Sequence, residues 1–467
     1  MVVPTPNTAQ FCIKKNAKTM VKTTTSSNIF KCLDIQPTTC QAKALYEIEN
    51  FLDNKEDQVF ILKGSAGTGK TTLTKALVDY LSEKNKPFHL LSPTAKAASI
   101  LSDKTNHMAH TIHHLIYTPE TLDDGRVKFN FKENESDTPT IFIVDEASMI
   151  PALNPSTGEY ISQNPLLLDL LKFVFNGNKY NQIIFLGDSY QLQPIHEKSS
   201  MALSKKALRE NFKLKCQEIE LNEVVRQASD SPVLSLALEI KRAKDYAQSV
   251  YSIKPERLRN EDLAIDYFMT FFDVEELNEV MLIAKTNEQV ERYNQLIRKR
   301  LGFYQTLEVG EVVMLRNNIQ KDQQTFVNGD IGLIKSLSSN TEEIAGIRFK
   351  DATIQFENSG EKTLVKTKIF LDSLLNNTAS IDSQSLKNLK HNRMKHNGTF
   401  RQSERVNDDP YMNAMKLSYA YAMTCNKAQG SEWSRVLFTS EKLHPYDHPW
   451  LYTAVTRAKN EVLTWRF

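Results

Sequence analysis

The sequence predicts an α/β protein with two domains built on parallel sheets, a β-hairpin inserted in the first domain and a small antiparallel barrel inserted in the second. Three observations support this fold class. Short apolar strands alternate with amphipathic helices from 34 to about 223, and a glycine-rich loop follows the first of these strands. The alternation starts again at Val280, and short strands separated by Gly, Asn and Ser then interrupt it.

The length and composition fit this organisation. A chain of 467 residues exceeds one compact core, so three or four domains are expected. With 40% hydrophobic and 24% charged residues the chain is typical of globular proteins, and no apolar run reaches the roughly 20 residues that span a bilayer. The five cysteines are widely spaced and form no CxxC pair, which argues against a disulfide framework or a zinc site and favours a reducing compartment.

Charge is informative only in its distribution. The net charge is +2, from 58 basic and 56 acidic residues, and does not identify a partner. Residues 1–33 contain five lysines and no acid, and the segment 383–403 contains five lysines and arginines and no acid. We expect 1–33 to be a flexible basic arm. For both segments a solvated surface and a DNA contact remain alternatives.

The strongest motif is the glycine-rich loop Gly64–Thr72, which fits GxxxxGK[ST] and follows the predicted strand Val59–Leu62. Such a loop turns backbone N–H groups toward phosphates at the N-terminus of a helix, whose dipole favours anions. Lys70 is expected to reach the β- and γ-phosphates, and the Thr71 hydroxyl to ligate Mg²⁺. The predicted nucleotide-binding residues of the loop are Gly64, Ala66, Gly67, Thr68, Gly69, Lys70, Thr71 and Thr72.

Two more predicted strands end in polar groups that complete this site. The strand Ile141–Val144 ends in Asp145, a candidate Mg²⁺ ligand, and Glu146, a candidate for polarising the attacking water. The strand Ile183–Leu186 leads to Gln191, which can contact a γ-phosphate or its attacking water. These residues predict a site that hydrolyses a nucleoside triphosphate with Mg²⁺ as cofactor.

The domain boundaries follow from changes along the chain in the pattern of apolar runs and of the residues that separate them. We assign 34–225 to the first domain, with a hairpin insertion at about 115–139, and 226–302 plus 411–467 to the second. The insertion 303–410 has five short apolar runs that predict the small barrel, followed by a polar, basic stretch. The runs are Val312–Leu315, Ile331–Ile334, Ile344–Phe349, Thr353–Phe356 and Thr363–Phe370.

In this order the motifs resemble those of superfamily 1 DNA helicases of the RecD-like branch, superfamily 1B, and most closely the Dda-type phage helicases. The resemblance covers nearly everything from Gln41 to the C-terminus and is weak over 1–33 and about 340–410. It implies two RecA-like P-loop motor domains, an SH3-like barrel with a tower, and an ATP-dependent helicase. Such an enzyme would translocate 5′→3′ on single-stranded DNA and unwind duplex, coupling ATP hydrolysis at the cleft between its motor domains to stepping.

The resemblance assigns further residues to the nucleotide. Gln41 matches a glutamine that reads adenine. Arg226, within Leu221–Gln227, matches an arginine finger, and Arg457, within Leu451–Ala458, matches an arginine that meets the γ-phosphate. The segment Tyr419–Glu432 matches a motif that contributes Gly430 and Glu432 to the nucleotide site.

Other matched segments are implied to line the single-strand track. They contribute Pro93, Thr94, Lys96, Thr111, His113, Asn287, Thr424 and Asn426. The family usually has His where Asn426 stands, so a histidine-specific contact does not carry over. Thr286 beside Asn287 also fits a capping box with Gln289, so a purely structural role for Thr286 is an alternative.

The hairpin insertion has a sequence signature of its own. Asp124-Gly125 is a strong signal for a tight turn, and Val127, Phe129 and Phe131 alternate onto one face of the returning strand. Two functions remain open for Phe129 and Phe131. The rings either dock the hairpin on the first domain or form the pin that Dda-type helicases carry here, which stacks on the first unpaired base.

Two other functions compete with the helicase. The first is a single-strand translocase that mainly displaces proteins from DNA. The second is a non-catalytic scaffold, which is disfavoured because Lys70, Glu146 and Gln191 are all present. The expected partners are single-stranded DNA, forked or tailed duplex, and single-strand-binding or replisome proteins, without a membrane. The resemblance suggests a monomeric phage protein that acts in DNA replication in the cytoplasm of a bacterial host.

Overall fold

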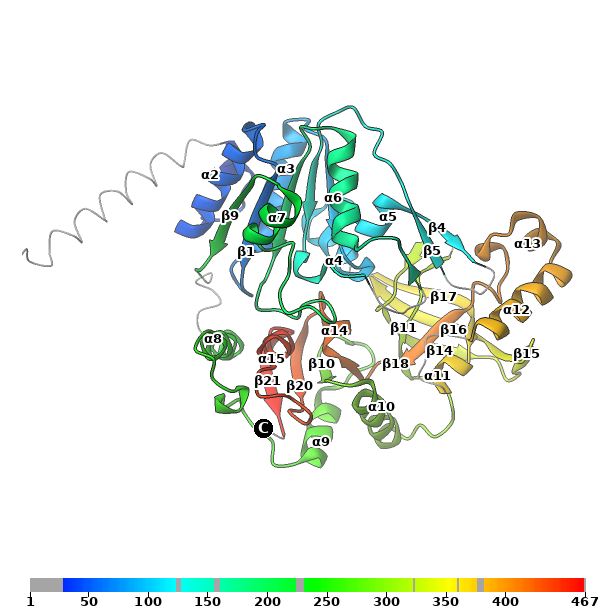
Figure 1. Ribbon diagram of the computed structural model, residues 1–467. Helices are drawn as coiled ribbons and strands as arrows, with labels where there is room; N and C mark the ends of the chain where they lie inside the picture. The colour runs from blue at the N-terminus through cyan, green and yellow to red at the C-terminus, as the bar shows by residue number, and fades with distance from the viewer. Residues whose placement is uncertain are drawn as a thin grey trace, which may run out of the picture.

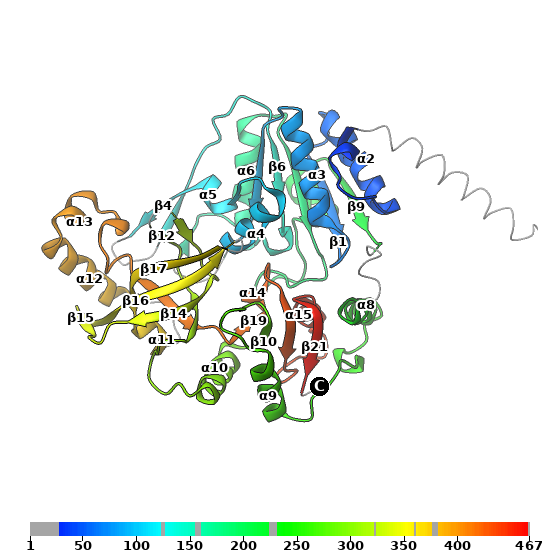
Figure 2. The same cartoon turned by 180° about the vertical axis from the view of Figure 1, so that it is seen from behind.

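The computed structural model describes residues 28–122, 127–154, 160–223, 231–321, 324–358, 361–375 and 382–465. Two α/β domains face one another, and the barrel insertion lies to one side of both (Figures 1 and 2). The predicted arm up to residue 27, the turn Asp124-Gly125 and the finger candidate Arg226 lie outside the described residues. Within the described ranges no helix has the length and apolar character needed to cross a membrane.

The first domain has a six-stranded parallel sheet in the order β3-β2-β6-β8-β1-β9. Its strands are β1 (Val59–Gly64), β2 (Phe88–Ser92), β3 (Ala109–Thr111), β6 (Ile141–Val144), β8 (Gln182–Gly187) and β9 (Cys216–Leu221). Every residue of β8 is buried, as expected for a parallel strand covered on both faces. The predicted strands at 59, 141 and 183 are confirmed.

Helices cover both faces of this sheet. One face carries α2 (Thr39–Asp53), α3 (Lys70–Glu83) and α4 (Ala95–Thr105), and the other carries α5 (Ile112–Ile116), α6 (Leu166–Gly177) and α7 (Lys205–Phe212). A short 3-10 helix, η2 (Ala147–Met149), follows β6. The two apolar cores hold the strands rigid, so the residues at the strand ends are fixed relative to one another.

The predicted flexible arm is wrong for its last residues. Residues Asn28–Cys32 form the 3-10 helix η1, and Ile29 is completely buried against the core beneath α2 and α3. Phe30, Cys32 and Leu33 are partly buried in the same cluster. The apolar run at 29–33 therefore adds to the first domain, which the Thr- and Lys-rich composition of the whole segment concealed.

The second domain has a four-stranded parallel sheet in the order β19-β10-β20-β21. Its strands are β10 (Val280–Ala284), β19 (Ala422–Thr424), β20 (Trp433–Phe438) and β21 (Ala458–Thr464). Its helices are α8 (Pro232–Asp245), α9 (Glu261–Phe271), α10 (Asn287–Leu301), α14 (Cys425–Ala428) and α15 (His448–Val455), with a 3-10 turn η4 (Val250–Ser252). The sheet is built from two segments of the chain, as predicted, because β10 precedes the barrel and the other strands follow it.

The barrel is closed by five strands in the ring β14-β11-β18-β17-β16, with β14 pairing back to β16. These are β11 (Val312–Leu315), β14 (Ile331–Leu337), β16 (Ile347–Asn358), β17 (Glu361–Phe370) and β18 (Met415–Tyr419). A short strand β15 (Glu342–Ile344) pairs antiparallel with the first residues of β16, and β12 (Ile319–Lys321) pairs with β13 (Gln324–Phe326) beside the barrel.

Two details of the predicted barrel need correction. The runs at 344–349 and 353–356 are not two strands, because β16 continues through Lys350–Ala352 along its partner β17. The insertion also does not end at 410, since β18 pairs with β11 and β17 and completes the barrel. The alternating burial of β18 resembles that of any half-buried strand, so its sheet could not be assigned from the sequence.

The basic segment after the barrel is folded and packed. It forms α12 (Ser383–His396) and α13 (Gly398–Ser403), preceded by α11 (Asp372–Leu375) and followed by η5 (Val406–Asp408). Leu389 and Phe400 are buried, and the Arg393 guanidinium contacts the buried Asp409 carboxylate at 2.9 Å. The described part of 383–403 is therefore folded, while Lys387, Lys395 and Arg401 are exposed on its surface, so a solvated surface and a DNA contact both remain alternatives.

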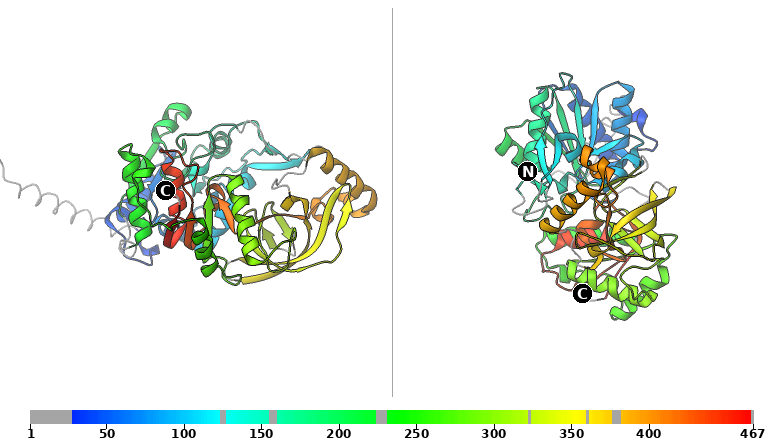
Figure 3. Two further views of the ribbon diagram at one scale, coloured as in Figure 1. Left: turned by 90° about the horizontal axis from the view of Figure 1, so that it is seen from below. Right: turned by 90° about the vertical axis from the view of Figure 1, so that its right-hand side faces the viewer.

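The predicted hairpin is present in the first domain. Its strands β4 (Tyr117–Thr121) and β5 (Val127–Phe131) are antiparallel, and the short strand β7 (Tyr160–Ile161) adds to β5 in parallel. The hairpin projects from the first domain toward the α12–α13 end of the barrel insertion (Figures 1 and 3). The third strand was not predicted.

A buried ion pair attaches the barrel to the second domain. The Arg298 guanidinium of α10 lies 2.6 Å from the Glu311 carboxylate at the entrance to β11, and the Glu311 side chain is inaccessible to solvent. Burial raises the pKa of Glu311 to about 7, and the charge and hydrogen bonds of Arg298 act in the opposite direction. Glu311 therefore depends on Arg298 for its charged form.

We predict that Arg298→Ala destabilises the second domain and barrel by about 3–5 kcal/mol, because it leaves a buried carboxylate unpaired. Arg300→Ala is the matched control, since its pair with Asp266 is exposed and contributes about 1 kcal/mol or less. Thermal unfolding of both variants, followed by circular dichroism, measures the difference. Equal shifts of the unfolding midpoint would contradict the role given to Arg298.

Candidate nucleotide cleft and nucleic-acid groove

The glycine-rich loop has the backbone that a phosphate cradle needs. Gly67 and Gly69 have φ values of 76° and 82°, which favour glycine, and Gly69 begins helix α3 without a side-chain cap. Gly64 is required for space, because a Cβ there would lie 2.5 Å from the Thr68 hydroxyl. The first N–H groups of α3 are therefore open toward the loop.

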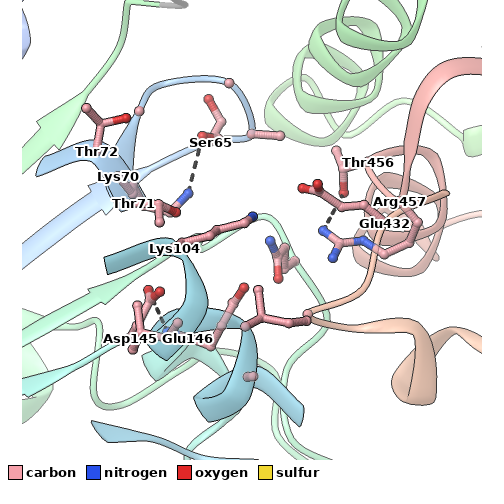
Figure 4. A pocket seen from close by; sticks show the side chains of 18 residues that line it. Ser65, Lys70, Thr71, Thr72, Lys104, Asp145, Glu146, Glu432, Thr456 and Arg457 are labelled. Carbon is pink, nitrogen blue, oxygen red and sulfur yellow. Dashed lines mark hydrogen bonds between the residues drawn. The ribbon is translucent and has the colours of Figure 1, made fainter. Parts of the chain in front are cut away.

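Lys70 lies across this loop. Its ammonium donates to the carbonyl oxygens of Gly64 at 2.6 Å and Ser65 at 3.3 Å. Figure 4 shows the ammonium turned back toward Ser65. Among the described residues Lys70 forms no ion pair with a carboxylate. Its charge is held by weak backbone acceptors, which an entering phosphate can displace.

The carboxyl ends of β6 and β8 supply three acceptors to the same cavity. The Glu146 N–H donates to the Asp145 carboxylate at 2.9 Å, and Glu146 has a left-handed φ of 51°. Burial raises the pKa of Asp145, and burial together with repulsion from Asp145 raises the pKa of Glu146. Glu146 Oε2 and Gln191 Oε1 are buried and have no hydrogen-bond partner among the described residues.

The opposite wall comes from the second domain. Arg457 follows α15 and is 5% exposed. Its guanidinium donates to the carbonyl oxygens of Thr453 and Ser431, each at 3.2 Å, and to the Thr456 hydroxyl at 3.3 Å. All three are neutral acceptors. Arg457 therefore brings an almost buried positive charge to the cavity. This charge offsets part of the rise in the pKa of Glu146.

The cavity between the two domains has a volume of about 310 Å³. Figure 4 shows the loop, the carboxylates and the arginine converging on it from different elements. The predicted residues that line it are Ala66, Gly67, Gly69, Lys70, Thr71, Thr72, Asp145, Glu146, Gln191, Gly430, Glu432 and Arg457. Residues that were not predicted also line it, namely Ser65, Ala97, Ile100, Leu101, Lys104 and Thr456.

Gln41 is not in this cavity, contrary to its implied role as an adenine contact. It is 1% exposed, its amide nitrogen donates to the Thr68 carbonyl at 2.9 Å, and its amide oxygen accepts from the Thr38 N–H at 2.9 Å. Gln41 thus caps α2 and braces the glycine-rich loop from behind. The sequence Thr38-x-x-Gln41 contains the capping-box signal that could have shown the first of these two roles. Gly64 and Thr68 belong to the loop but do not line the cavity.

The donor set fits a magnesium nucleotide. The Thr71 hydroxyl and the Asp145 carboxylate face the cavity, and oxygen donors of this kind, together with phosphates, suit Mg²⁺. Burial raises the pKa of both Asp145 and Glu146, and a divalent cation bound here would favour the charged form of both carboxylates.

A second cavity, of about 500 Å³, lies where the first domain, the barrel and the second domain meet. We call it the groove. Seven of the residues predicted to contact DNA line it: Pro93, Thr94, Lys96, Thr111, His113, Phe129 and Asn426. Residues that were not predicted complete it: Ala95, Met149, Met314, Asn318, Asn328, Gly329, Lys427 and Gln429. The barrel residues among them carry no motif, so only the fold brings them to the groove.

Three other predicted DNA contacts do not line the groove. Asn287 is exposed at the start of α10, where Thr286 and Gln289 form the capping box that was the structural alternative for Thr286. Thr424 is the N-cap residue of α14 and is not among the residues that line the groove. Phe131 packs edge-on against Phe173 of α6.

Phe129 lies in the wall of the groove. Its ring is 5.0 Å from the His113 ring and 5.4 Å from the Tyr117 ring, centroid to centroid. Phe131 is on the same face of β5 and also contacts Tyr117. Docking of the hairpin on the first domain is therefore observed for both rings, and only Phe129 also faces the groove.

An ion pair crosses the groove. The Lys96 ammonium of α4 lies 3.0 Å from the Asp330 carboxylate of the barrel, whose side chain is 4% exposed. Asp330 also accepts from the Val327 N–H at 2.8 Å, which fixes the carboxylate. On the second-domain side, burial lowers the pKa of Lys427 to about 8, with Arg316 acting in the same direction. The groove thus offers two cations to an anionic ligand, one of them held by a carboxylate.

Comparison with known proteins agrees with this architecture. Residues 40–254 match the family model described as an AAA domain, and residues 419–463 match that of the UvrD-like helicase C-terminal domain. The chain is 27% identical to the ATP-dependent DNA helicase dda of Enterobacteria phage T4, over 60% of this chain and 61% of the relative. It is 30% identical to the ATP-dependent RecD2 DNA helicase of Deinococcus radiodurans, over 38% of this chain and 21% of the relative. The chain thus matches less than two thirds of the length of these relatives.

A solved structure has the same fold. It describes DNA unwinding at forked double-stranded DNA by two coordinating Pif1 helicases, and its TM-score with this chain is 0.50. Sequence identity is 17%, and the match covers 92% of each chain. The similarity therefore includes both α/β domains and the insertion between the two halves of the second.

We predict that Asp330→Asn strengthens binding of single-stranded oligonucleotides roughly fivefold, the equivalent of about 1 kcal/mol for an ion pair near solvent. Asparagine keeps the acceptor for the Val327 N–H and releases Lys96 for a phosphate. Each added phosphate contact makes the salt dependence steeper by about 0.7 in the log–log slope. Fluorescence anisotropy at several salt concentrations measures both, with Asp266→Asn as the control. Unchanged affinity and slope would show that Lys96 binds no phosphate.

Proposed function

We propose that this chain is a superfamily 1 helicase of the RecD-like branch, an ATP-dependent DNA helicase that moves 5′→3′ along single-stranded DNA. One observation carries the proposal. The nucleotide cavity and the groove are both built between the first domain and the second, so a change in one cavity can be transmitted to the other. Direction and substrate follow from the resemblance, and the experiment below tests both.

Each side chain of the cleft has a defined role in the proposed hydrolysis. Lys70 and the N–H groups of the loop bind the phosphates, and Thr71 and Asp145 hold Mg²⁺. Held there, Mg²⁺ would supply positive charge to the phosphates. Glu146 orients and polarises the attacking water, for which its unpartnered buried oxygen is available. Gln191 contacts the γ-phosphate or the water, and Arg457 stabilises the charge of the transition state.

Hydrolysis is coupled to movement through Arg457. This arginine belongs to the second domain, whereas Lys70 and Glu146 belong to the first, so the catalytic set is complete only when the cleft is closed. A triphosphate favours closure because it binds both sides, and its cleavage removes contacts that held them together. The groove is lined by the same domains and changes with each closure. Arg226, the second proposed finger, lies outside the described residues.

Duplexes with a single-stranded tail on one strand test the proposal. We expect ATP-dependent strand separation with a 5′ tail and little with a 3′ tail. Lys70→Ala is the inactive control: it loses ATP turnover by about 10²-fold or more, because the β/γ-phosphate charge loses its point-charge partner, while single-stranded DNA is still bound. Hydrolysis without strand separation on either tail, together with release of a protein block from single-stranded DNA, would favour the translocase alternative.

The groove position of Phe129 predicts a role at the fork. If its ring stacks on a base, Phe129→Ala keeps the ATPase activity that single-stranded DNA stimulates and lowers strand separation per ATP by roughly 5- to 100-fold, from a stacking energy of about 1–3 kcal/mol. Phe131→Ala is the matched control, because its ring packs on α6 outside the groove. Rates of unwinding and hydrolysis on one forked substrate give the ratio. A parallel loss of both rates in the Phe129 variant would instead indicate that the ring only docks the hairpin.

A further inference from the structure

Helix α15 of the second domain holds a loop of the first domain at two points. The Tyr452 hydroxyl donates to the Asp188 carboxylate at 2.7 Å, and the Thr453 hydroxyl accepts from the Leu192 N–H at 2.8 Å. Asp188 and Leu192 lie on either side of Gln191, whose amide oxygen is buried in the cleft without a partner. The position of Gln191 is therefore set by a helix of the opposite domain.

The Tyr452 hydroxyl makes a second contact, to the glycine-rich loop. Tyr452 Oη accepts from the Ala66 N–H at 2.9 Å. A carboxylate can only accept and an amide N–H can only donate, so the direction of both hydrogen bonds is fixed. Burial raises the pKa of Tyr452 far above its usual value. The hydroxyl therefore stays protonated and donates its hydrogen bond to Asp188. One buried oxygen thus joins the loop, the Gln191 segment and α15.

These contacts connect groups that hydrolysis needs together. Ala66 and Gln191 line the nucleotide cavity, and so does Arg457, which follows α15. Tyr452 itself does not line the cavity, although its ring lies 6.0 Å from that of Tyr190 beside Gln191. Tyr452 can therefore act on the reaction only through the groups that it holds.

We propose that Tyr452 is a positioning residue for ATP hydrolysis. Its hydroxyl sets Ala66 of the loop and Gln191 of the first domain at a fixed place relative to Arg457 of the second. Gln191 and Arg457 are thereby held on facing walls of one cavity, from which both can reach the γ-phosphate at the same time. The proposal rests on the function proposed above and adds to it the group that couples the two walls of the cleft.

Tyr452→Phe is the direct test in the full chain, because it keeps the ring and removes only the hydroxyl. We expect a kcat for ATP hydrolysis with single-stranded DNA that is about 10- to 100-fold lower, the loss typical of one hydrogen bond to a charged group. The Kd of a fluorescent ATP analogue and the Kd of single-stranded DNA should stay nearly unchanged. Tyr80→Phe is the matched control: it also loses a hydroxyl bonded to a carboxylate, that of Glu49, but within the first domain, and its kcat should equal that of the wild type.

Thr453→Val removes the hydroxyl that accepts from the Leu192 N–H, the second contact between α15 and the Gln191 segment. This variant tests the positioning role if Tyr452→Phe unfolds. It should also lower kcat at an unchanged Kd for the nucleotide. A hydroxyl that only stabilises the fold would instead lower the unfolding midpoint of Tyr452→Phe and leave the kcat of the folded fraction intact, which would overturn the inference. An active wild type with equally active Tyr452→Phe and Thr453→Val variants contradicts only this inference. A wild type without ATPase activity contradicts the proposed function as well.

Discussion

The contact between helix α15 and the carboxyl edge of the first sheet is the constraint on which both cavities depend. Lys70, Asp145 and Gln191 follow parallel strands and lie at one edge of the sheet. Helix α15 attaches the second domain to that edge through hydrogen bonds at Ala66, Asp188 and Leu192. The nucleotide cavity is the space left beside this contact, and the groove lies between the same bodies and the barrel. A protein with either domain alone would have half of each site.

Charge in the cleft explains why the observed arrangement of the two domains suits a nucleotide. Asp145, Glu146 and Arg457 are withdrawn from water, which raises the pKa of both carboxylates and leaves Arg457 with neutral acceptors. Electrostatic interactions are strong in such a place, and unpaired groups are costly. The proposed magnesium nucleotide would place a cation beside the two carboxylates and an anion beside Arg457, so its binding and its cleavage would change the stability of the interface between the domains.

The sequence was most informative where function depends on neighbours in the chain. The loop Gly64–Thr72 and the strand ending in Asp145 and Glu146 carry their own geometry, so the nucleotide site and the parallel sheets could be predicted. It was least informative where contacts are distant. The pairing of β18 with the barrel, the Lys96–Asp330 ion pair and the bracing of the loop by Gln41 each join residues whose proximity only the fold creates. For the same reason Lys427 and the barrel residues of the groove were missed.

We propose that nucleotide in the cleft and DNA in the groove are coupled through the contact between the two domains, and reciprocal binding tests this coupling most directly. Thermodynamic linkage requires that a nonhydrolysable ATP analogue change the Kd of single-stranded DNA by the same factor by which the DNA changes the Kd of the analogue. Both factors can be measured by titration on the wild-type chain at one salt concentration. The structure predicts equal factors clearly different from one. A factor of one in both titrations would show that the cleft and the groove are independent and would contradict the account.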